Sequence, residues 1–266
     1  MKITVLTVTF RDSVRILGQA KMLEAQTFQD FEWVVVDDLY GERSGFFESH
    51  GVGKAFPFLH VPPRHVAGHQ APHEALNTAI MHARGDLLYF MADTVAPTEG
   101  VLEAHWEAFE KFGPAVIMSG PMAAGKGHVN IQTRLSGNSL DGDTTQIDDE
   151  DSLRQWYWAG RNDSASLEYV LRINGFRERM DGFYGGGDVV FAAQMIAAGC
   201  RYLGLRKGTC YDEFPHEPKK PTVPHELDSK PWQELFKASL AGDTWSPNDI
   251  NLREERDARM STHARH

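Results

Sequence analysis

This chain is poor in the features that mark secreted, membrane and disulfide-bonded proteins. Of its 266 residues only two are cysteines, Cys200 and Cys210, and neither lies in a metal-binding or redox motif. Two isolated thiols fit a reducing compartment, so we expect a cytoplasmic protein. A β-branched run begins already at Ile3, and we expect no leader segment before the fold. No apolar run is long enough to cross a bilayer, which argues against a pore or a membrane-embedded synthase.

Basic charge is also scarce. The sequence holds 27 Lys and Arg against 37 Asp and Glu, a net charge of −10. A nonspecific nucleic-acid binder normally displays a basic field, so this balance argues against one without excluding a local basic groove. Internal repeats and low-complexity segments are absent, and nothing in the sequence indicates an oligomeric state. The length and the 41% hydrophobic content fit a globular α/β protein.

The most informative segment runs from residue 75 to residue 93. Small and apolar residues between Ala75 and Ala83 recur with helical spacing, and Gly85 can end that helix. The apolar run Leu87–Met91 predicts a strand buried on both faces, after which Asp93 leaves the core. Ligands of open α/β sheets bind at the carboxyl ends of strands, where an acid can hold a cation that carries a diphosphate. Alternatively, Asp93 is a loop residue that caps the next helix.

The N-terminal segment repeats this architecture. Ile3–Thr9 predicts a strand, residues 13–26 a helix, and Phe31–Val36 a second buried strand followed by Asp37 and Asp38. Strand, helix and strand in this order predict a parallel sheet with right-handed crossovers. The two acids could bond a ribose hydroxyl or a base edge, or they could be solvated turn formers.

Together these segments resemble the glycosyltransferases of the GT-A fold, most closely their family 2. Thr9–Arg11 stands where that family has a Thr-Tyr-Asn type of motif, and Val36–Tyr40 where it has Val-Asp-Asp-Gly-Ser. Ala75–Ile80 matches an Ala-Leu-Asn-x-Ala-Ile helix, and Ala83–Asp86 matches its Ala-x-Gly-Asp ending. The family's Asp-x-Asp motif reads Met91–Asp93 here, so its first acid is missing.

The resemblance implies a GT-A α/β fold with a mostly parallel central sheet flanked by helices. Residues 1–215 would form the glycosyltransferase domain, with a nucleotide-sugar-binding half at 1–120, an acceptor-binding half at 121–215 and a C-terminal extension at 216–266. The implied activity is transfer of a sugar from a nucleotide diphosphate sugar, a UDP-sugar first, to a glycan, a lipid-linked or another hydroxyl acceptor. The implied nucleotide-sugar-binding residues are Thr9, Arg11, Asp37, Asp38, Asn77 and Asp93.

A second stretch extends the resemblance. Ile173–Glu178 is similar to the family's Gly-Gly-Phe-Asp-Glu segment, and Tyr184–Phe191 to its Gly-x-Glu-Asp motif, with Gly187 in place of the Glu. This implies that Asp188 is the general base of an inverting transfer. At a helix N-terminus the carboxylate is favoured, so we expect Asp188 to be ionised and able to take a proton. The alternative role is a plain helix cap.

The acceptor site is expected to draw on two segments. Gly186 and Gly187 would let the backbone approach a sugar closely. Trp156 and Trp158 could stack on sugar faces, or the aromatic triplet could pin a loop to the core. Residues 161–164, which include Asn162, are interpreted as a loop lining the site, and the acidic stretch 137–151 as a mobile loop.

The resemblance also implies a divalent cation, Mn²⁺ or Mg²⁺. Its ligands would be Asp93 and His216, with His225 in reserve, and imidazole is an ordinary ligand of Mn²⁺. The four histidines at 60, 65, 69 and 73 have no cysteines beside them, and we expect them in a polar surface loop.

Two other functions remain open on the sequence. The chain could be a sugar-nucleotide or glycan-binding module that has lost its catalytic power together with the missing acids. It could also be a transferase that acts on modified bases in viral DNA, although the acidic balance argues mildly against that acceptor.

Overall fold

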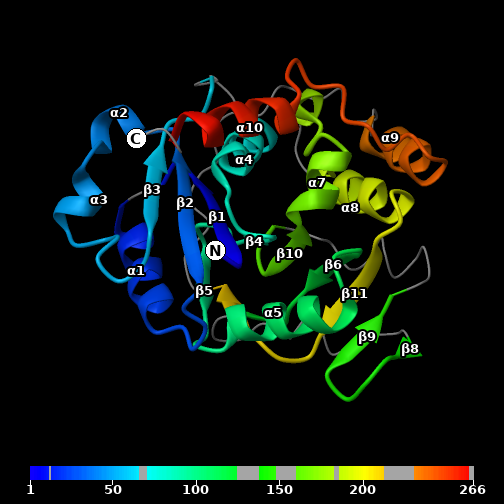
Figure 1. The fold of residues 1–266 in the computed structure, drawn as a ribbon, viewed down its shortest axis with the longest axis horizontal. Helices are drawn as coiled ribbons and strands as arrows, with labels where there is room; N and C mark the ends of the chain where they lie inside the picture. Colours follow the sequence, from blue (N-terminus) through cyan, green and yellow to red (C-terminus); the bar gives the residue numbers. More distant parts are fainter. Residues whose placement is uncertain are drawn as a thin grey trace.

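A nine-stranded sheet forms the centre of the protein (Figure 1). The structure, a computed structural model, describes residues 1–11, 13–65, 71–124, 138–147, 160–182, 186–212 and 231–263. In spatial order, the strands are β3 (Phe58–Val61), β2 (Phe31–Asp37), β1 (Ile3–Thr9), β4 (Leu87–Phe90), β10 (Asp163–Ser166), β6 (Val116–Ser119), β11 (Arg201–Leu205), β9 (Thr144–Gln146) and β8 (Asn138–Ser139).

The sheet is mostly parallel, as predicted. The neighbours β3, β2, β1 and β4 pair in parallel, and so do β6 and β11. Of the nine strands, β10 and β9 run against the others, because β10 is antiparallel to both β4 and β6, and β9 to both β11 and β8. The carboxyl ends of β1, β2 and β4 therefore meet at one edge of the sheet.

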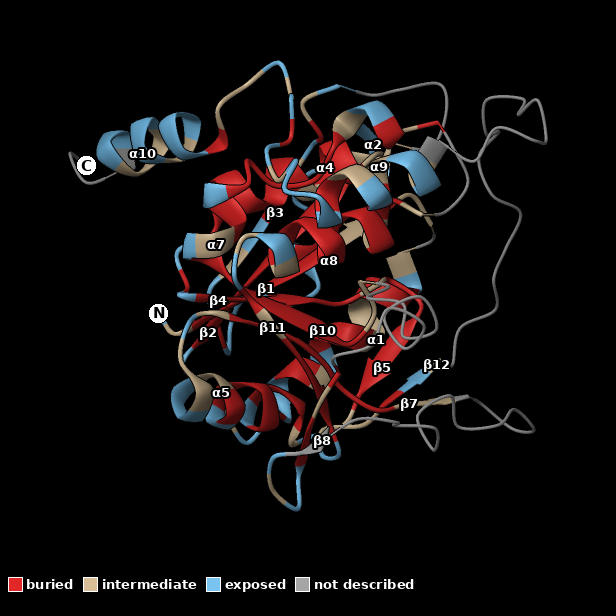
Figure 2. Ribbon diagram, turned by 90° about the vertical axis from the view of Figure 1, so that its right-hand side faces the viewer, coloured by how far each residue is buried: buried red, intermediate tan, exposed pale blue. Residues whose placement is uncertain are grey.

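Helices cover both faces, and the strand residues alternate between two hydrophobic clusters. Val5 and Trp33 face the side of α1 (Ser13–Glu24), α3 (Phe46–Ser49) and α5 (Val101–Phe112). Leu6 and Val34 face the side of α4 (Pro72–His82), α7 (Leu167–Arg172) and α8 (Gly187–Ala197). Burial on both faces explains why these strands read as continuous apolar runs in the sequence. Figure 2 shows the central strands buried and the outer helices exposed on one side.

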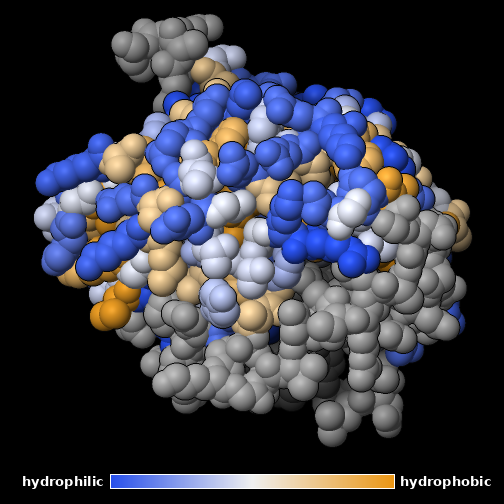
Figure 3. All heavy atoms as spheres, turned by 90° about the horizontal axis from the view of Figure 1, so that it is seen from below, coloured by the Kyte–Doolittle hydropathy of each residue, from blue (hydrophilic) through white to orange (hydrophobic). Residues whose placement is uncertain are grey.

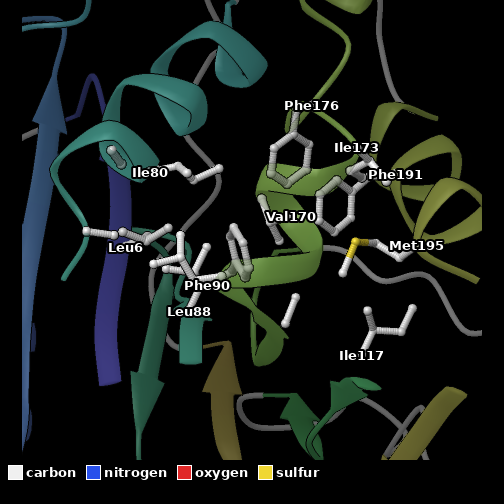
Figure 4. Packing of buried hydrophobic residues seen from close by; sticks show 14 of the residues in the cluster. Leu6, Ile80, Leu88, Phe90, Ile117, Val170, Ile173, Phe176, Phe191 and Met195 are labelled. Carbon is white, nitrogen blue, oxygen red and sulfur yellow. The ribbon is translucent and has the colours of Figure 1, made fainter. Parts of the chain in front are cut away.

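Aromatic rings fix α8 against the sheet and the segment after α7. The rings of Phe176 and Phe191 stack with centroids 4.1 Å apart, and Phe90 of β4 meets both edge-on (Figure 4). Offset and edge-to-face pairs of this kind contribute about 1 kcal/mol each beyond their burial. This packing sets the position of the α8 N-terminus relative to the end of β4.

A second, three-stranded sheet lies beside the first. It consists of β5 (Val95–Pro97), β12 (Cys210–Asp212) and β7 (Met122–Ala124), with β12 antiparallel to β5 and parallel to β7. Because β5 begins two residues after Asp93, this sheet holds the chain that leaves β4.

The C-terminal residues pack into the same core. The helix α9 (Pro231–Leu240) contacts α8, and α10 (Leu252–His263) contacts α4. Leu252 is fully buried, and its backbone N–H donates to the side chain of Asn174 at 2.8 Å. Asn174 in turn donates to the carbonyl oxygens of Ser246 and Ile250, both at 2.9 Å. Residues 231–263 thus complete the face of the sheet that α4 and α8 cover. The remaining short elements are α2 (Tyr40–Arg43) and the 3₁₀ turn η2 (Glu178–Met180).

Three expectations from the sequence are corrected here. Within the stretch expected to be a mobile loop, β8 and β9 form a hairpin that extends the main sheet from β11. Residues 163–166, expected in part as a loop, form the central strand β10. His60 and His73 are buried on β3 and α4 instead of lying in a surface loop, whereas His65 is exposed and His69 lies outside the described residues. Short polar strands carry little periodicity, and burial of a histidine depends on partners far away in the sequence.

The described surface seen in Figure 3 is mainly hydrophilic, with hydrophobic residues in small groups. Among the helices that the structure describes, none combines the length and apolar character needed to span a membrane.

Candidate functional site

A cavity of about 240 Å³ opens where β1 and β4 end and α4 begins. The two strands supply Thr9 and the segment after β4, Met91 to Asp93, while Ala71 and Pro72 lie at the start of α4. Its lining residues are Leu6, Val8, Thr9, Phe10, Arg11, Asp38, Ala71, Pro72, Ala75, Leu76, Met91, Ala92, Asp93 and Gly160. The cavity thus lies where the sequence predicted a ligand, at the carboxyl ends of parallel strands.

Asp93 is held in place by two partners from the end of β1. Its Oδ2 accepts a hydrogen bond from the Thr9 hydroxyl at 2.8 Å, and its Oδ1 pairs with Arg11 Nη1 at 2.5 Å. The residue is only 2% exposed, so this ion pair is little screened by water. Thr9, Arg11 and Asp93, three of the predicted nucleotide-sugar-binding residues, are therefore brought together at one wall of the cavity.

The two acids after β2 have different surroundings. Asp37 is fully buried, and its carboxylate accepts from the Leu39 N–H at 2.9 Å and contacts Arg43 Nη1 and His60 Nε2, both at 3.2 Å. With both oxygens engaged in the interior, Asp37 fixes the turn after β2. Asp38 is partly exposed and lines the cavity. Of this predicted pair, Asp38 is therefore the residue placed to meet a ligand.

Asn77, like Asp37, has its polar side-chain atoms engaged in the protein interior. It is fully buried on α4, where Nδ2 donates to the Phe176 carbonyl at 2.9 Å and to Glu178 Oε1 at 2.8 Å. Its Oδ1 accepts from the Phe176 N–H at 2.9 Å and would lie 2.4 Å from a Cβ at Gly175. These contacts join α4 to the segment before α8, and none of these partners lines the cavity.

Asp188 lies in the first turn of α8, as predicted from its motif. It is partly exposed, and its Oδ1 accepts from the N–H of Val189 at 2.9 Å. Burial of the carboxyl raises the pKa of Asp188, against the opposing effects of that N–H and of nearby His73. We expected the positive helix end to lower the pKa of Asp188, and this expectation is corrected, because desolvation has the larger effect on that pKa. A raised pKa makes the carboxylate a better proton acceptor.

The glycines before Asp188 accommodate protein side chains. Gly186 has a φ of +88°, and a Cβ there would lie 2.4 Å from Cγ of Trp232 on α9. A Cβ at Gly187 would lie 1.9 Å from Nε2 of His73. Both glycines were predicted to admit an acceptor sugar, but in this structure Trp232 and His73 occupy the space that their missing side chains leave.

His73 and Asp181 also belong to this region, although no motif in the sequence predicted them there. Asp181 Oδ1 lies 2.7 Å from His73 Nδ1 and 2.9 Å from the His73 N–H, and Oδ2 accepts from the Glu74 N–H at 2.9 Å. Asp181 therefore binds the start of α4 and orients the imidazole toward α8. His73 follows Pro72, which lines the cavity, so the contact between α8 and α4 lies one residue along α4 from the cavity lining. The one signal in the sequence was a histidine in the first turn of the helix that carries Asn77.

The remaining predicted acceptor residues divide into two groups. Asn162 is 1% exposed and donates to the carbonyl oxygens of Pro121 at 2.8 Å and Gly208 at 2.9 Å, while its Oδ1 accepts from the Tyr89 hydroxyl at 2.8 Å. It therefore ties the start of β10 to the segments that precede β7 and β12. Trp156, Trp158 and the predicted metal ligand His216 lie outside the described residues.

The donor set around Asp93 does not fit a divalent cation. Both of its carboxylate oxygens already have partners, one of them the Arg11 cation, and Met91 stands where a second acid would supply ligands. Among the residues that the structure describes, no three His, Cys, Asp or Glu side chains cluster as a metal site. A hard cation needs several free oxygen ligands, and the carboxylate of Asp93 has none to offer, since the Thr9 hydroxyl and Arg11 engage both of its oxygens.

Comparison with known proteins identifies the fold. No protein-family model matches the sequence, and a search among curated proteins gives no match. Among solved structures, TarS of S. aureus in complex with UDP-GlcNAc aligns with a TM-score of 0.69 and 15% identity, over 96% of this chain and 69% of that one. TarS in complex with UDP aligns with a TM-score of 0.65 and 14% identity, over 96% of this chain and 68% of that one.

A third structure extends this likeness to another enzyme. GalNAc-T7 with UDP, GalNAc and Mn²⁺ aligns with a TM-score of 0.63 and 10% identity, over 96% of this chain and 54% of that one. These neighbours are GT-A glycosyltransferases, so the chain has the GT-A fold, and the fold expected from the sequence motifs is confirmed.

Proposed function

We propose that this protein is a glycosyltransferase that moves a sugar from a nucleotide diphosphate sugar to an acceptor hydroxyl. The observation that carries the proposal is the cavity at the ends of β1 and β4, which gathers Thr9, Arg11, Asp38 and Asp93. Ligands of open α/β sheets bind at this edge, and these side chains offer hydrogen-bonding groups together with a cation for a diphosphate. Structures of the same fold with UDP or UDP-GlcNAc bound favour a UDP-sugar as the donor.

Asp188 is the proposed general base. Its carboxylate would take the proton of the acceptor hydroxyl as that oxygen attacks the anomeric carbon, while the bond from this carbon to the diphosphate breaks. A single displacement of this kind inverts the anomeric centre. Support comes from its place in the first turn of α8, next to Gly187, which meets His73 one residue from the cavity lining, and from the burial that raises its pKa.

The test is release of the nucleotide leaving group from a panel of UDP-, GDP-, CMP- and dTDP-sugars, with a set of glycan, lipid-linked and simple hydroxyl acceptors. The leaving group is a nucleoside diphosphate, except that a CMP-sugar releases CMP. We expect release from a UDP-sugar by the wild-type chain and a loss of at least about 100-fold in Asp188→Asn, because removal of a general base typically costs that much. Asp257→Asn is the matched control, since Asp257 lies on α10 with its side chain 62% exposed. Nucleotide binding without release for any donor and acceptor would indicate a binding module.

A further inference from the structure

The guanidinium of Arg11 places a positive charge at the ends of β1 and β4. Arg11 pairs with Asp93 at 2.5 Å, and its guanidinium lies over the ring of Phe10 at 4.5 Å. Its side chain is 12% exposed, and both Arg11 and Asp93 line the cavity. A positive charge so placed raises the energy of a divalent cation bound to the same carboxylate, because like charges at a few ångströms repel strongly in a poorly solvated site.

The position of Arg11 is fixed by a network behind it. Arg43 donates from Nη2 to the Arg11 carbonyl oxygen, while its Nη1 pairs with the buried Asp37 at 3.2 Å. His60 Nε2 holds the same Asp37 oxygen at 3.2 Å. The backbone at the end of β1 is therefore tied to the end of β2, and Asp93 sets the direction of the side chain. A preorganised cation of this kind loses little conformational freedom when it binds a ligand.

The guanidinium also retains bonding capacity. One of its nitrogens, Nη1, binds Asp93, whereas the buried Nε has no hydrogen-bond partner among the described residues. Arginine presents its N–H groups in a planar fork that matches phosphate oxygens, and such charge-assisted bonds are among the strongest in proteins. Because the Arg11 side chain is 12% exposed and lines the cavity, the edge of this fork that does not bind Asp93 can donate to a diphosphate there.

We propose that Arg11, oriented by Asp93, takes the place of a divalent cation and binds the diphosphate of the sugar donor, so that transfer proceeds without a metal. This inference rests on the proposed function. As the bond between the anomeric carbon and the diphosphate oxygen breaks, negative charge grows on the departing nucleoside diphosphate, and Arg11 stabilises it. The acceptor oxygen forms the new bond to that carbon, and its proton passes to Asp188. Asp93 acts through Arg11 and is a positioning residue.

The experiment measures binding of UDP and uridine by titration calorimetry, once with EDTA and once with MnCl₂. We expect the Kd of UDP for the wild-type chain to agree within about twofold between the two conditions. Arg11→Gln should weaken UDP binding by about 10- to 100-fold, the size expected for lost charge-assisted hydrogen bonds, and should leave uridine binding unchanged because uridine has no phosphate. The affinity of Arg11→Lys for UDP should lie between those of the wild type and Arg11→Gln, since lysine keeps the charge and loses the planar fork of N–H groups.

The control is Arg253→Gln, which removes an exposed arginine of α10 and should change neither ligand's affinity. Two results overturn the inference: UDP binding that strengthens about tenfold or more with Mn²⁺, or Arg11→Gln binding UDP as the wild type does. The comparison of EDTA with MnCl₂ uses the unaltered chain, so it decides the question even if Arg11→Gln does not fold. The proposed function survives either result, whereas failure of the wild-type chain to bind any nucleotide sugar in both conditions overturns the two together.

Discussion

The imidazole of His73 occupies the space that a side chain at Gly187 would need, with Nε2 only 1.9 Å from the position of a Cβ there. Gly187 opens α8, and His73 lies in the first turn of α4, so the two helices approach each other through this contact. Because Asp181 holds the ring through Nδ1, the imidazole cannot simply turn away. A side chain at 187 must therefore move the ring or separate the helices.

Gly187→Ala should lower the free energy of unfolding by about 1–3 kcal/mol, the usual cost of overpacking in a closely packed region. The loss should occur although alanine favours a helix over glycine by up to about 1 kcal/mol. Urea unfolding measures the effect. Gly187→Ala should cost less stability when it is added to His73→Ala than when it is added to the wild type, because the ring it meets is gone. Gly41→Ala is the control, because a Cβ on α2 at that position meets nothing within 4 Å. Equal stability of Gly187→Ala and wild type would contradict the contact.

Asp188→Asn should remove transfer and at the same time stabilise the fold at neutral pH. The pKa of Asp188 is raised by burial, so the folded state carries a penalty once the carboxyl ionises. That penalty is absent below the pKa of the unfolded chain and reaches its full size above the raised pKa of the folded one. The Tm of Asp188→Asn should thus exceed that of the wild type by a few degrees at pH 7–8 and match it near pH 3. A lower Tm at pH 7 than the wild type would show that the charge stabilises the site.

His105 should make the fold sensitive to mild acid. It is fully buried between Ser164, 2.7 Å from Nδ1, and Asn162, 3.1 Å from Nε2, and burial lowers its pKa to about 4. The unfolded chain takes up this proton near pH 6.5, so stability is complete above that pH and falls as the pH drops toward 4, by about 3 kcal/mol in total. His105→Gln does not titrate, and its free energy of unfolding should decline less steeply between pH 7 and pH 4.5. Parallel profiles of the two proteins would contradict the assignment.

Asn77→Ala should act on stability and leave ligand affinity alone. Its side chain satisfies the N–H and the carbonyl group of Phe176 in the interior, so truncation leaves buried polar groups without partners. We expect a loss of about 2–4 kcal/mol in urea unfolding and a Kd for UDP within about twofold of the wild type, measured at a temperature where the variant is folded. Weakened UDP binding without a loss of stability would instead place Asn77 at the ligand.

Local pattern was enough to predict most of the architecture. The apolar runs at 3–9, 31–36 and 87–91 are strands because both of their faces are buried, and such runs need no knowledge of partners to be recognised. The acids that follow them could be placed at one edge of the sheet for the same reason. The strands β8, β9 and β10 were missed because they are short and polar, and their pairing with distant strands supplies what their own residues lack.

The positions of the site residues could likewise be predicted from the sequence only in part. Thr9, Arg11, Asp38 and Asp93, which lie at or just after strand ends, line the cavity. Asp37 is the last residue of β2 and is fully buried, whereas Asp38 follows the strand and is partly exposed. The end of the strand could be read from the sequence, but the partners of Asp37 come from residues 43 and 60, which no local pattern connects to it.

The order of buried strands, the polar residues at their ends and the place of Asp188 in the first turn of α8 follow from the sequence, because each depends on the chemistry of neighbouring residues. Tertiary structure alone decided which of those residues turn inward, that the guanidinium of Arg11 lies on Asp93, and that His73 and Trp232 fill the space beside two glycines. These contacts join segments tens of residues apart. They form only when the whole chain is folded, because the close packing of the interior then brings the side chains together.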